Sequence, residues 1–427
     1  MRIMMMTNTY LPHVGGVARS VAAYTQALRE RGHRVVVVAP EFEQAPVGEK
    51  DVIRVPAIQK FNGSDFSVSI PSDGLLQDCV DDLQPDVIHS HHPFLLGGAA
   101  QRLAGINNIP LVFTHHTLYE QYTHYVPGDS KFMKRFVAAL STEYANLAQL
   151  VIAPSESVRD LLCSRGVTTP VEVLPTGVDR VFFDKGDGRA FRKVMGIPAD
   201  AFVVGHVGRL AFEKNLEFMT EAVARFLKAN PQALFMVAGT GPAKLAMEEI
   251  CEKHGISERV VMAGTLGQPI LSSAYKAMDV FVFASQSETQ GMVLTEAMAG
   301  RVPVVAVDAS GVREVLRDGV NGYMLPKQSI DSFVKALQEF HDLPPAMRQR
   351  FRRAALGTAQ SFSLENCAAE LEAKYERLMH DRASVSMESP DAWEGVMKKL
   401  EAEWNMLSNL ASAAGRALSG SLDQEVS

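Results

Sequence analysis

The stretch from Val280 to Val305, VFVFASQSETQGMVLTEAMAGRVPVV, decides the fold of this chain. It begins with a run of β-branched and aromatic residues, Val280–Phe283, which is typical of a buried parallel strand. A polar loop follows from Ser285 to Gln290, and Gly291 then opens a helix. Because a helix start at the mouth of a sheet presents backbone N–H groups and the positive end of a dipole, this place favours phosphate binding.

Two glutamates with seven residues between them lie in the same stretch. We expect Glu288 in the loop at the carboxyl edge of the sheet, and Glu296 about two turns into the helix. A carboxylate does not attract phosphate, but it accepts hydrogen bonds from the hydroxyls of sugars and riboses. The stretch therefore predicts a ligand that carries phosphate and many hydroxyls, such as a nucleotide-sugar.

The first half of the chain alternates between strand and helix patterns. We expect a strand at residues 1–6, a loop that contains Pro12, Gly15 and Gly16, and a helix from about Val17 to Arg31. The later strands of this half are predicted at residues 34–39, 87–89, 111–114 and 151–153. Alternation of this kind indicates a parallel, doubly wound sheet.

The pattern starts again near residues 174–177, and the polar, glycine-rich stretch 185–189 is typical of a linker. The second series of strands is predicted to begin at residues 202–205 and to continue at 234–238, 260–262, 280–283, 302–307 and 322–325. The sequence thus predicts an α/β protein with two Rossmann-like, doubly wound domains facing across a cleft. Ligands in such folds bind at the carboxyl ends of the strands.

The order and spacing of several motifs, over roughly residues 1–380, resemble the retaining GT-B glycosyltransferases of family 4. The motifs beside Glu288 and Glu296 are TYLPHVGGVARSV, PDVIHSHHP, THHTLYEQY, VIAPSESVRDLL, LPTGVD, VGRLAFEKNLEFM, VAGTGP and SGVREVLRDGVNGYML. The resemblance implies an acceptor-side domain at 1–178, a nucleotide-sugar domain at 179–362 and a helix returning to the first domain at 363–382.

Arg209 and Lys214 follow a predicted strand, and in the family these two positions hold the diphosphate of the donor. A nucleoside diphosphate gains negative charge as it leaves, so fixed cations stabilise the transition state more than the ground state. Two cations at this place remove the need for a metal, and no Asp-x-Asp motif follows a strand. We therefore expect a metal-independent enzyme without a cofactor, for which the nucleotide-sugar is a substrate.

The resemblance assigns the remaining site residues. His116 supports the transferring sugar and the transition state, with His115 as the alternative, while the departing phosphate acts as the base. His116, Glu288, Arg209 and Lys214 form the catalytic set. The donor contacts implied are Gly15, Gly16, Gly239, Gly241, Leu266, Gly291, Met292, Val293, Leu294 and Glu296. Gln290 stands where the family usually has Phe, a departure that could alter the choice of donor sugar.

Composition narrows the class of protein. With 427 residues, 47% of them hydrophobic and 21% charged, the chain can bury two ordinary cores. A net charge of −7 argues against a nucleic-acid partner. The four cysteines, Cys79, Cys163, Cys251 and Cys367, are scattered and indicate neither a zinc site nor disulfides. Without a signal peptide or a long apolar segment, we expect a cytoplasmic protein.

The acceptor is predicted less directly. The segment from Tyr119 to Tyr125 is similar to bacterial diacylglycerol glucosyltransferases, and Phe132–Phe136 could form a basic and aromatic contact with the inner face of a membrane. An extra amphipathic helix and tail are predicted at 388–420, packed on protein or lying on a membrane. Its polar face mixes both charges, which membrane-surface helices rarely do.

The sequence predicts a hexosyltransferase that uses a UDP- or GDP-sugar and a hydroxyl acceptor such as diacylglycerol. The alternatives are transfer to a soluble sugar or polyol, a sugar-nucleotide epimerase, or a binding protein of the same fold. A phosphorylase would need a lysine that holds pyridoxal phosphate, and no segment indicates one. The set of Arg209, Lys214, Glu288, Glu296 and His116 disfavours a protein that only binds.

Overall fold

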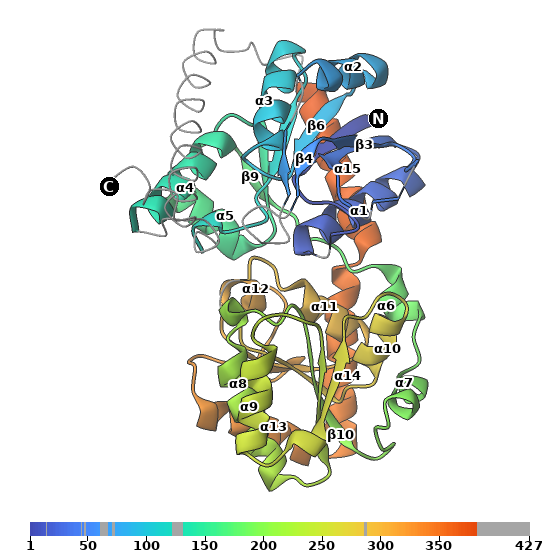
Figure 1. Cartoon of the computed structure of the whole chain (residues 1–427), viewed down its shortest axis with the longest axis vertical. Coiled ribbons are helices and arrows are strands. Elements are labelled where there is room, and N and C mark those ends of the chain that lie inside the picture. The colour runs from blue at the N-terminus through green and yellow to red at the C-terminus, as the bar shows by residue number, and fades with distance from the viewer. Residues whose placement is uncertain are drawn as a thin grey trace, which may run out of the picture. The chain divides into compact units, whose positions relative to one another are not determined.

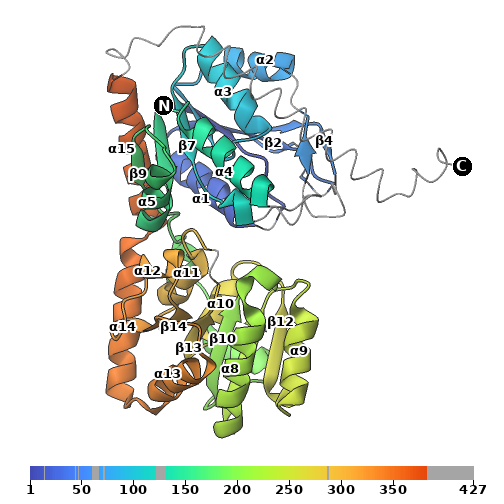
Figure 2. The same cartoon turned by 90° about the vertical axis from the view of Figure 1, so that its left-hand side faces the viewer.

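The computed structural model describes residues 1–381, apart from Val14, Gln44, Val47, 60–66, 71–72, 122–130 and 286–287. The helix predicted at 388–420 lies outside these residues. The chain forms two compact units (Figures 1 and 2). Unit 1 comprises Met1–Ile152, Leu161–Glu172 and the segment that begins at Glu372, and unit 2 comprises Ala153–Asp160 and Val173–Leu371.

Unit 1 is built on a parallel sheet. Its described strands have the order β3-β2-β1-β6-β7-β8-β9, with β4 and β5 as a small antiparallel pair beside them. The elements are β1 (Arg2–Met6), α1 (Gly16–Glu30), β2 (Arg34–Pro40), β3 (Val52–Val55), β4 (Ala57–Ile58), β5 (Val68–Ser69), α2 (Asp73–Leu83), β6 (Val87–Ser90), α3 (Leu96–Ile106), β7 (Leu111–Thr114), η2 (Tyr119–Gln121), α4 (Lys131–Ala145), β8 (Leu150–Ala153), α5 (Glu156–Ser164) and β9 (Val171–Val173).

Unit 2 is built on a second parallel sheet, with the described strands in the order β12-β11-β10-β13-β14-β15. Its elements are α6 (Arg180–Asp184), α7 (Gly188–Val194), β10 (Phe202–Val207), η4 (Phe212–Lys214), α8 (Leu216–Ala229), β11 (Ala233–Ala238), α9 (Lys244–Lys253), η5 (Ser257–Arg259), β12 (Val260–Gly264), α10 (Ile270–Lys276), β13 (Val280–Phe283), α11 (Met292–Ala299), β14 (Val304–Val307), α12 (Ser310–Arg313), β15 (Gly322–Leu325), α13 (Ile330–Asp342) and α14 (Pro345–Ser361). Helix α15 (Leu364–Asp381) begins in unit 2 and ends in unit 1.

The strands of unit 2 are apolar on both faces because helices cover both. Phe281 and Phe283 belong to the cluster that contacts α10, α11 and α14, whereas Val280 and Val282 belong to the cluster that contacts α8, α9 and α13. Figure 1 shows these two helix groups on opposite sides of the sheet. Burial of each such side chain contributes roughly 1.5–3 kcal/mol to folding. The continuous apolar run that predicted β13 is explained by this double covering.

Both sheets reverse their strand order at one place, as the Rossmann topology requires. The reversal lies between β1 and β6 in unit 1, and between β10 and β13 in unit 2. The prediction of two doubly wound, Rossmann-like domains is confirmed. Crevices that bind ligands form at the carboxyl ends of strands beside such a reversal.

The N-terminal stretch forms β1, an inner strand of unit 1 between β2 and β6, and Ile3, Met4, Met5 and Met6 are fully buried. The end of α15 packs on the same unit. There Tyr375 is buried, and its hydroxyl lies 2.6 Å from Nδ1 of His89.

Two predictions from local pattern are wrong. Residues 185–189 are not a linker between units, because Gly186 and Gly188 pack inside unit 2 against α10. A Cβ on Gly188 would lie 2.3 Å from the carbonyl oxygen of Lys276. Glu296 lies little more than one turn into its helix rather than two, because α11 begins at Met292.

Candidate functional site

The reversal point of unit 2 brings together two of the expected site residues. Lys214 ends η4 in the loop after β10, and Glu288 lies in the loop after β13. The Nζ atom of Lys214 donates to Oε1 of Glu288 at 2.5 Å. The two loops are also joined by Asn215, whose Nδ2 donates to the carbonyl oxygen of Ala284 at 3.2 Å. An ammonium group has three N–H donors, so Lys214 can hold Glu288 and an anionic ligand together.

Arg209 lies in the same loop as Lys214. Its guanidinium pairs with the carboxylate of Glu213 one turn away, and about half of its side chain is exposed. An exposed pair of this kind adds little to folding stability. A ligand with more negative charge than one carboxylate could therefore replace Glu213 as the hydrogen-bond partner of the Arg209 guanidinium.

Gly239 and Gly241 hold the loop after β11 against the loop after β10. A Cβ on Gly239 would lie 1.8 Å from the carbonyl oxygen of Gly208, and one on Gly241 would lie 2.4 Å from that of Leu210. The amide of Leu210 donates to the carbonyl oxygen of Thr240 at 2.9 Å. Only residues without a side chain permit this approach, so these glycines fix the start of the loop that carries Arg209 and Lys214.

Leu266 lies two residues beyond the end of β12 and is half-buried against the core of unit 2. Thr265 beside it is exposed, and its hydroxyl lies 3.1 Å from that of Thr240. Leu266 thus lies at the same edge of the sheet as Gly239 and Gly241.

Helix α11 starts directly after the loop that carries Glu288. Gly291 caps it with a left-handed φ of +71°, and the amide of Leu294 already donates to the carbonyl oxygen of Gly291 at 2.9 Å. The amides of Gly291, Met292 and Val293 precede this first helical bond, as in any helix start. The amide of Leu294 is therefore occupied within the helix, whereas the three before it belong to the helix start, where anions bind in many proteins.

Glu296 is buried in the first turns of α11. Its Oε2 accepts a hydrogen bond from the hydroxyl of Tyr275 at 2.8 Å, and only 2% of the residue is exposed. A buried carboxylate needs such partners. Tyr275 orients this acid, a role that the sequence pattern did not indicate.

In unit 1, Gly15 caps α1 and Gly16 is its first residue. A Cβ on Gly15 would lie 3.1 Å from Nε2 of His13, whereas one on Gly16 would meet nothing within 4 Å. Gly16 therefore leaves space beside the helix start, and Gly15 is crowded.

His116 follows β7 and is half-buried. Its Nε2 lies 2.9 Å from Nδ1 of His91, which follows β6. His115 instead is fully buried and contacts the rings of Phe113 and Tyr119. Of the two candidates, His116 is thus the one at the surface of unit 1. His91 was missed from the sequence, although the motif PDVIHSHHP contains it.

The histidines around His116 are neutral. Burial lowers the pKa of His89 and His92 to about 3 and that of His115 to about 4. Burial, with neighbouring histidines, also holds the pKa values of His91 and His116 well below the usual value. His91 Nε2 is buried with no hydrogen-bond partner among the described residues. Because a buried N–H without an acceptor is the costlier state, the proton of His91 sits on Nδ1 and is donated to His116.

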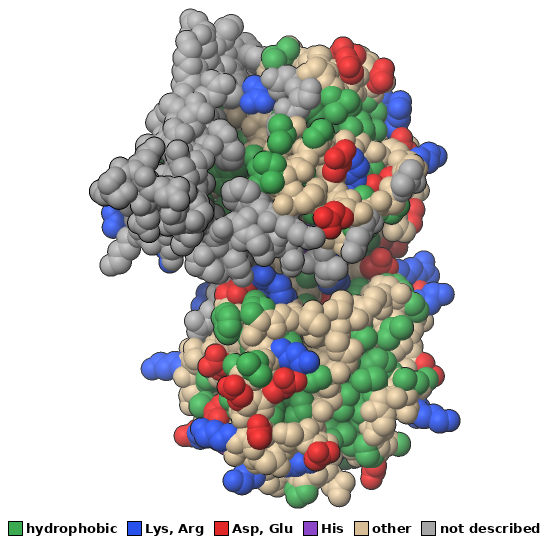
Figure 3. Space-filling view, in the orientation of Figure 1, with side chains coloured by type: hydrophobic (Ala, Val, Ile, Leu, Met, Phe, Trp, Pro, Cys, Tyr) green, Lys and Arg blue, Asp and Glu red, His purple; other side chains and the backbone are tan. Residues whose placement is uncertain are grey.

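The described residues contain no group of three or more His, Cys, Asp or Glu side chains that could hold a metal ion. Over the same residues, no helix has both the length and the apolar character needed to cross a bilayer. On the face of unit 2 drawn in Figure 3, acidic and basic side chains are interspersed.

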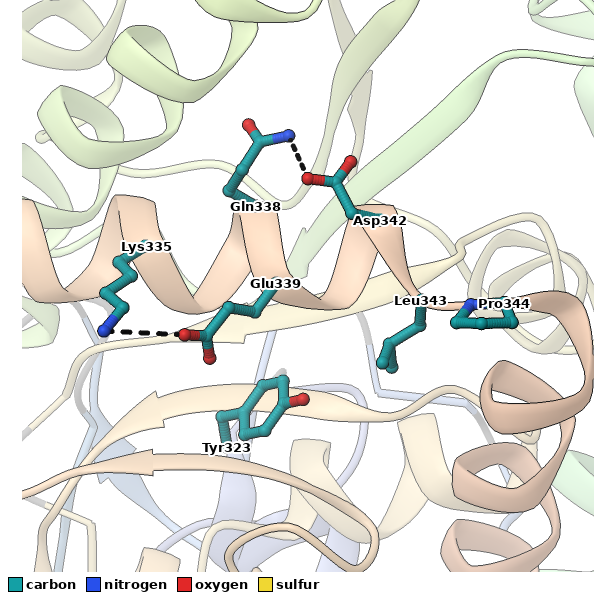
Figure 4. A pocket seen from close by; sticks show the side chains of 7 residues that line it. All are labelled: Tyr323, Lys335, Gln338, Glu339, Asp342, Leu343 and Pro344. Carbon is teal, nitrogen blue, oxygen red and sulfur yellow. Dashed lines mark hydrogen bonds and ion pairs between the residues drawn. The ribbon is translucent and has the colours of Figure 1, made fainter.

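A surface pocket of unit 2 lies away from this site (Figure 4). It is lined by Tyr323, Lys335, Gln338, Glu339, Asp342, Leu343 and Pro344. The last of these residues follow the C-terminus of α13, which lies at the amino edge of a parallel sheet. Its polar groups pair with one another, as Gln338 does with Asp342 at 2.9 Å.

Most of the chain matches known protein families. Residues 14–182 match the family described as Glycosyltransferase Family 4, and residues 187–357 match Glycosyl transferases group 1. The chain is 30% identical over 328 residues to an alpha-monoglucosyldiacylglycerol synthase of Streptococcus pneumoniae, covering 75% of this chain and 74% of the relative. It is 28% identical over 378 residues to the enzyme of the same name from Acholeplasma laidlawii, covering 84% and 92%.

A solved structure supports the fold alone. Sucrose-phosphate synthase from Thermosynechococcus elongatus superposes with a TM-score of 0.74 at 20% identity, covering 89% of this chain and 100% of the other.

The buried histidines predict an acid-sensitive fold. Their folded pKa values lie below the unfolded value of 6.5, so the unfolded chain takes up protons first and stability falls as pH drops from 6.5 towards 4. Each group contributes up to about 1.4 kcal/mol per pH unit. We expect the melting temperature to fall between pH 6.5 and 5, and to fall less for His89→Gln. An unchanged melting temperature over this window would show that these histidines are not buried as described.

Glu296 tests the donor role of α11. We expect Glu296→Gln to keep an acceptor for Tyr275 and the fold, yet to weaken binding of UDP or GDP by about 1–3 kcal/mol, the usual range for hydrogen bonds to charged groups. Isothermal titration calorimetry gives this difference. Glu339→Gln is the matched control, because it makes the same exchange in an exposed ion pair with Lys335 on α13. If Glu296→Gln binds UDP or GDP as tightly as the wild type, Glu296 does not contact the ribose.

Proposed function

Because the chain belongs to family 4 of the GT-B glycosyltransferases, we propose that it transfers glucose from a nucleoside diphosphate sugar to the hydroxyl of a lipid such as diacylglycerol. The observation that supports this most is its similarity to two alpha-monoglucosyldiacylglycerol synthases over most of both chains. The donor is UDP- or GDP-glucose. Since sugar nucleotides of glucose are α-linked, an α-glucoside product corresponds to retention.

The geometry of unit 2 supports donor cleavage. When the bond between the sugar and the diphosphate breaks, negative charge develops on the diphosphate oxygens. Lys214, Arg209 and the first amides of α11 supply positive charge and N–H donors at one edge of the sheet. Preorganised groups of this kind stabilise the transition state without the cost of reorienting solvent.

The carboxylates bind hydroxyls rather than phosphate. Glu288, held by Lys214, accepts from the sugar, and Glu296, held by Tyr275, accepts from the ribose. In unit 1, the neutral ring of His116, held by His91, hydrogen-bonds to the transferring sugar. The departing phosphate takes the proton from the hydroxyl of the acceptor. The pKa of His116, which burial holds well below its usual value, makes the ring a weak base, so it suits hydrogen bonding to a sugar better than removal of the acceptor proton.

The direct test is a transfer assay. We expect label from UDP- or GDP-[14C]glucose to enter the organic phase when dioleoylglycerol is supplied in mixed micelles. The anomeric proton coupling of the product should be that of an α-glucoside. Label found only on added glucose or glycerol would contradict the lipid acceptor, and a β-glucoside would contradict retention. Interconversion of the donor without an acceptor would identify an epimerase.

Lys214 and Arg209 should matter far more for turnover than for folding. We expect Lys214→Met and Arg209→Ala to lower kcat at least a hundredfold, because each removes charge from the leaving diphosphate, while the melting temperature changes little. Arg225→Ala is the matched control, since Arg225 makes an exposed ion pair with Glu221 on α8 in the same unit. A loss of activity that follows the loss of folded protein would refute the catalytic role.

Metal independence is a further expectation of the proposal. The cations and amides of the chain offset the negative charge of the leaving diphosphate, which is the role that Mg²⁺ would otherwise have. The rate of transfer in 5 to 10 mM EDTA, roughly the excess needed over trace divalent ions, should equal the rate without it. Loss of activity that Mg²⁺ or Mn²⁺ restores would contradict this.

Membrane attachment can be tested by sedimentation with vesicles. Lys134 and Arg135 are exposed on α4, and basic residues near an anionic surface each contribute about 1 kcal/mol. We expect the protein to sediment with phosphatidylglycerol vesicles at low salt and to be released as salt screens the attraction. The triple change Lys131, Lys134 and Arg135→Glu should weaken sedimentation but not UDP binding. Wild type that stays in the supernatant at low salt would exclude this attachment.

A further inference from the structure

Gln290 lies in the loop between β13 and α11, directly before the Gly291 cap, and makes an unusual contact. Its Oε1 accepts from the backbone N–H of Thr176 at 2.7 Å, and its Nε2 donates to the backbone carbonyl of the same residue at 2.6 Å. Gln290 is 5% exposed and Thr176 is 4% exposed. One amide side chain thus satisfies both main-chain groups of one buried residue, in the way that a neighbouring strand would.

Thr176 is itself a fixed point within unit 2. The next residue, Gly177, packs so closely on Leu364 that a Cβ would lie 2.3 Å from its Cα. Val178 then pairs with the stretch before α15, donating to the carbonyl oxygen of Phe362 at 2.7 Å and accepting from the amide of Leu364 at 3.0 Å. The loop that carries Gln290 is bonded to Thr176, so its position is fixed by these contacts.

The loop is also confined from its other flank. The amide of Gly311 donates to the carbonyl oxygen of Glu288 at 3.2 Å, and a Cβ on Gly311 would lie 2.8 Å from the backbone carbon of Gln290. The loop runs directly from Glu288 through Gln290 to Gly291, the cap of α11. Any shift of Gln290 would move the carboxylate of Glu288 and the first amides of α11 together.

We propose that Gln290 is a positioning residue for donor binding, which acts through the backbone of Thr176 and not by touching the donor sugar. The paired amide sets the loop so that Glu288 meets Lys214 and the start of α11 faces the diphosphate. This inference rests on the proposed function in taking the loop as the diphosphate site. It replaces the expectation that the departure from Phe at this position acts by choosing the sugar.

The exchange Gln290→Glu gives a signature that a general loss of packing would not give. At pH 7.5 the carboxylate can accept from the Thr176 amide, but it faces the Thr176 carbonyl without a proton to donate. Lowering the pH protonates the buried acid, whose pKa burial raises, and restores the missing donor. Gln290→Met has a similar volume and no hydrogen-bonding group, so it cannot be rescued in this way.

The experiment measures the Kd of UDP and GDP by calorimetry at pH 7.5 and 5.5, always as the ratio of variant to wild type. We expect Gln290→Glu to bind at least tenfold more weakly at pH 7.5, and this deficit to shrink at least fivefold at pH 5.5. Gln290→Met should bind at least tenfold more weakly at both pH values. Gln338→Met is the matched control, because it removes an amide bonded to Asn230 and Asp342 far from the loop, and it should bind as wild type does.

Two results would overturn the proposal. One is wild-type affinity in both Gln290 variants, and the other is equal weakening of Gln290→Glu at the two pH values. The measurement needs no acceptor and no turnover. If Gln290→Glu shows this pH signature in UDP or GDP binding but the wild type fails to glucosylate diacylglycerol, the positioning role holds and the proposed acceptor fails.

Discussion

The candidate site of unit 2 depends on one packing constraint, the close approach of two backbones at the carboxyl edge of the sheet. The loop after β11 passes over the loop after β10, with Gly239 against the carbonyl oxygen of Gly208 and the amide of Leu210 bonded to Thr240. Any side chain at Gly239 would force the two loops apart. Arg209 and Lys214 lie further along the loop after β10, so this contact sets the position of both cations.

The same contact places the charged side chains of this edge of the sheet. Lys214 reaches Glu288 across the reversal point of the sheet, so a cation and an acid meet where α11 begins. Glu288 and Glu296 are each held by a partner, Lys214 and Tyr275, and are therefore oriented before any ligand arrives. The same design recurs in unit 1, where His91 holds His116 and both rings are neutral. In each case a second residue fixes a side chain that the family resemblance assigns to substrate binding.

The sequence predicted most of the strands because buried parallel strands have a local signature. Residues 111–114 and 280–283 match β7 and β13 to the residue, since both are apolar runs covered on two faces. Val302 and Pro303 were wrongly added to β14, because Pro303 has no N–H for a ladder bond and the strand begins after it. The glycine-rich stretch 185–189 was wrongly predicted as a linker. Composition alone cannot distinguish glycines of a flexible segment from glycines that permit close packing.

The contacts that orient the site could not be read from the sequence. Tyr275 and Glu296, Gln290 and Thr176, and His91 and His116 are pairs far apart along the chain, brought together only by the folded sheets. Their spacing follows no motif. The candidate site residues came from the resemblance to a family, whereas the partners that hold them are evident only in the folded structure.

The central claim, that the reversal point of unit 2 binds the donor diphosphate, is tested most directly by a crystal structure of the protein with UDP or GDP. The account predicts β-phosphate oxygens within hydrogen-bond distance of Lys214 Nζ, the Arg209 guanidinium and the amides of Gly291 and Met292. A diphosphate bound elsewhere, with these groups making no contact to it, would contradict the account.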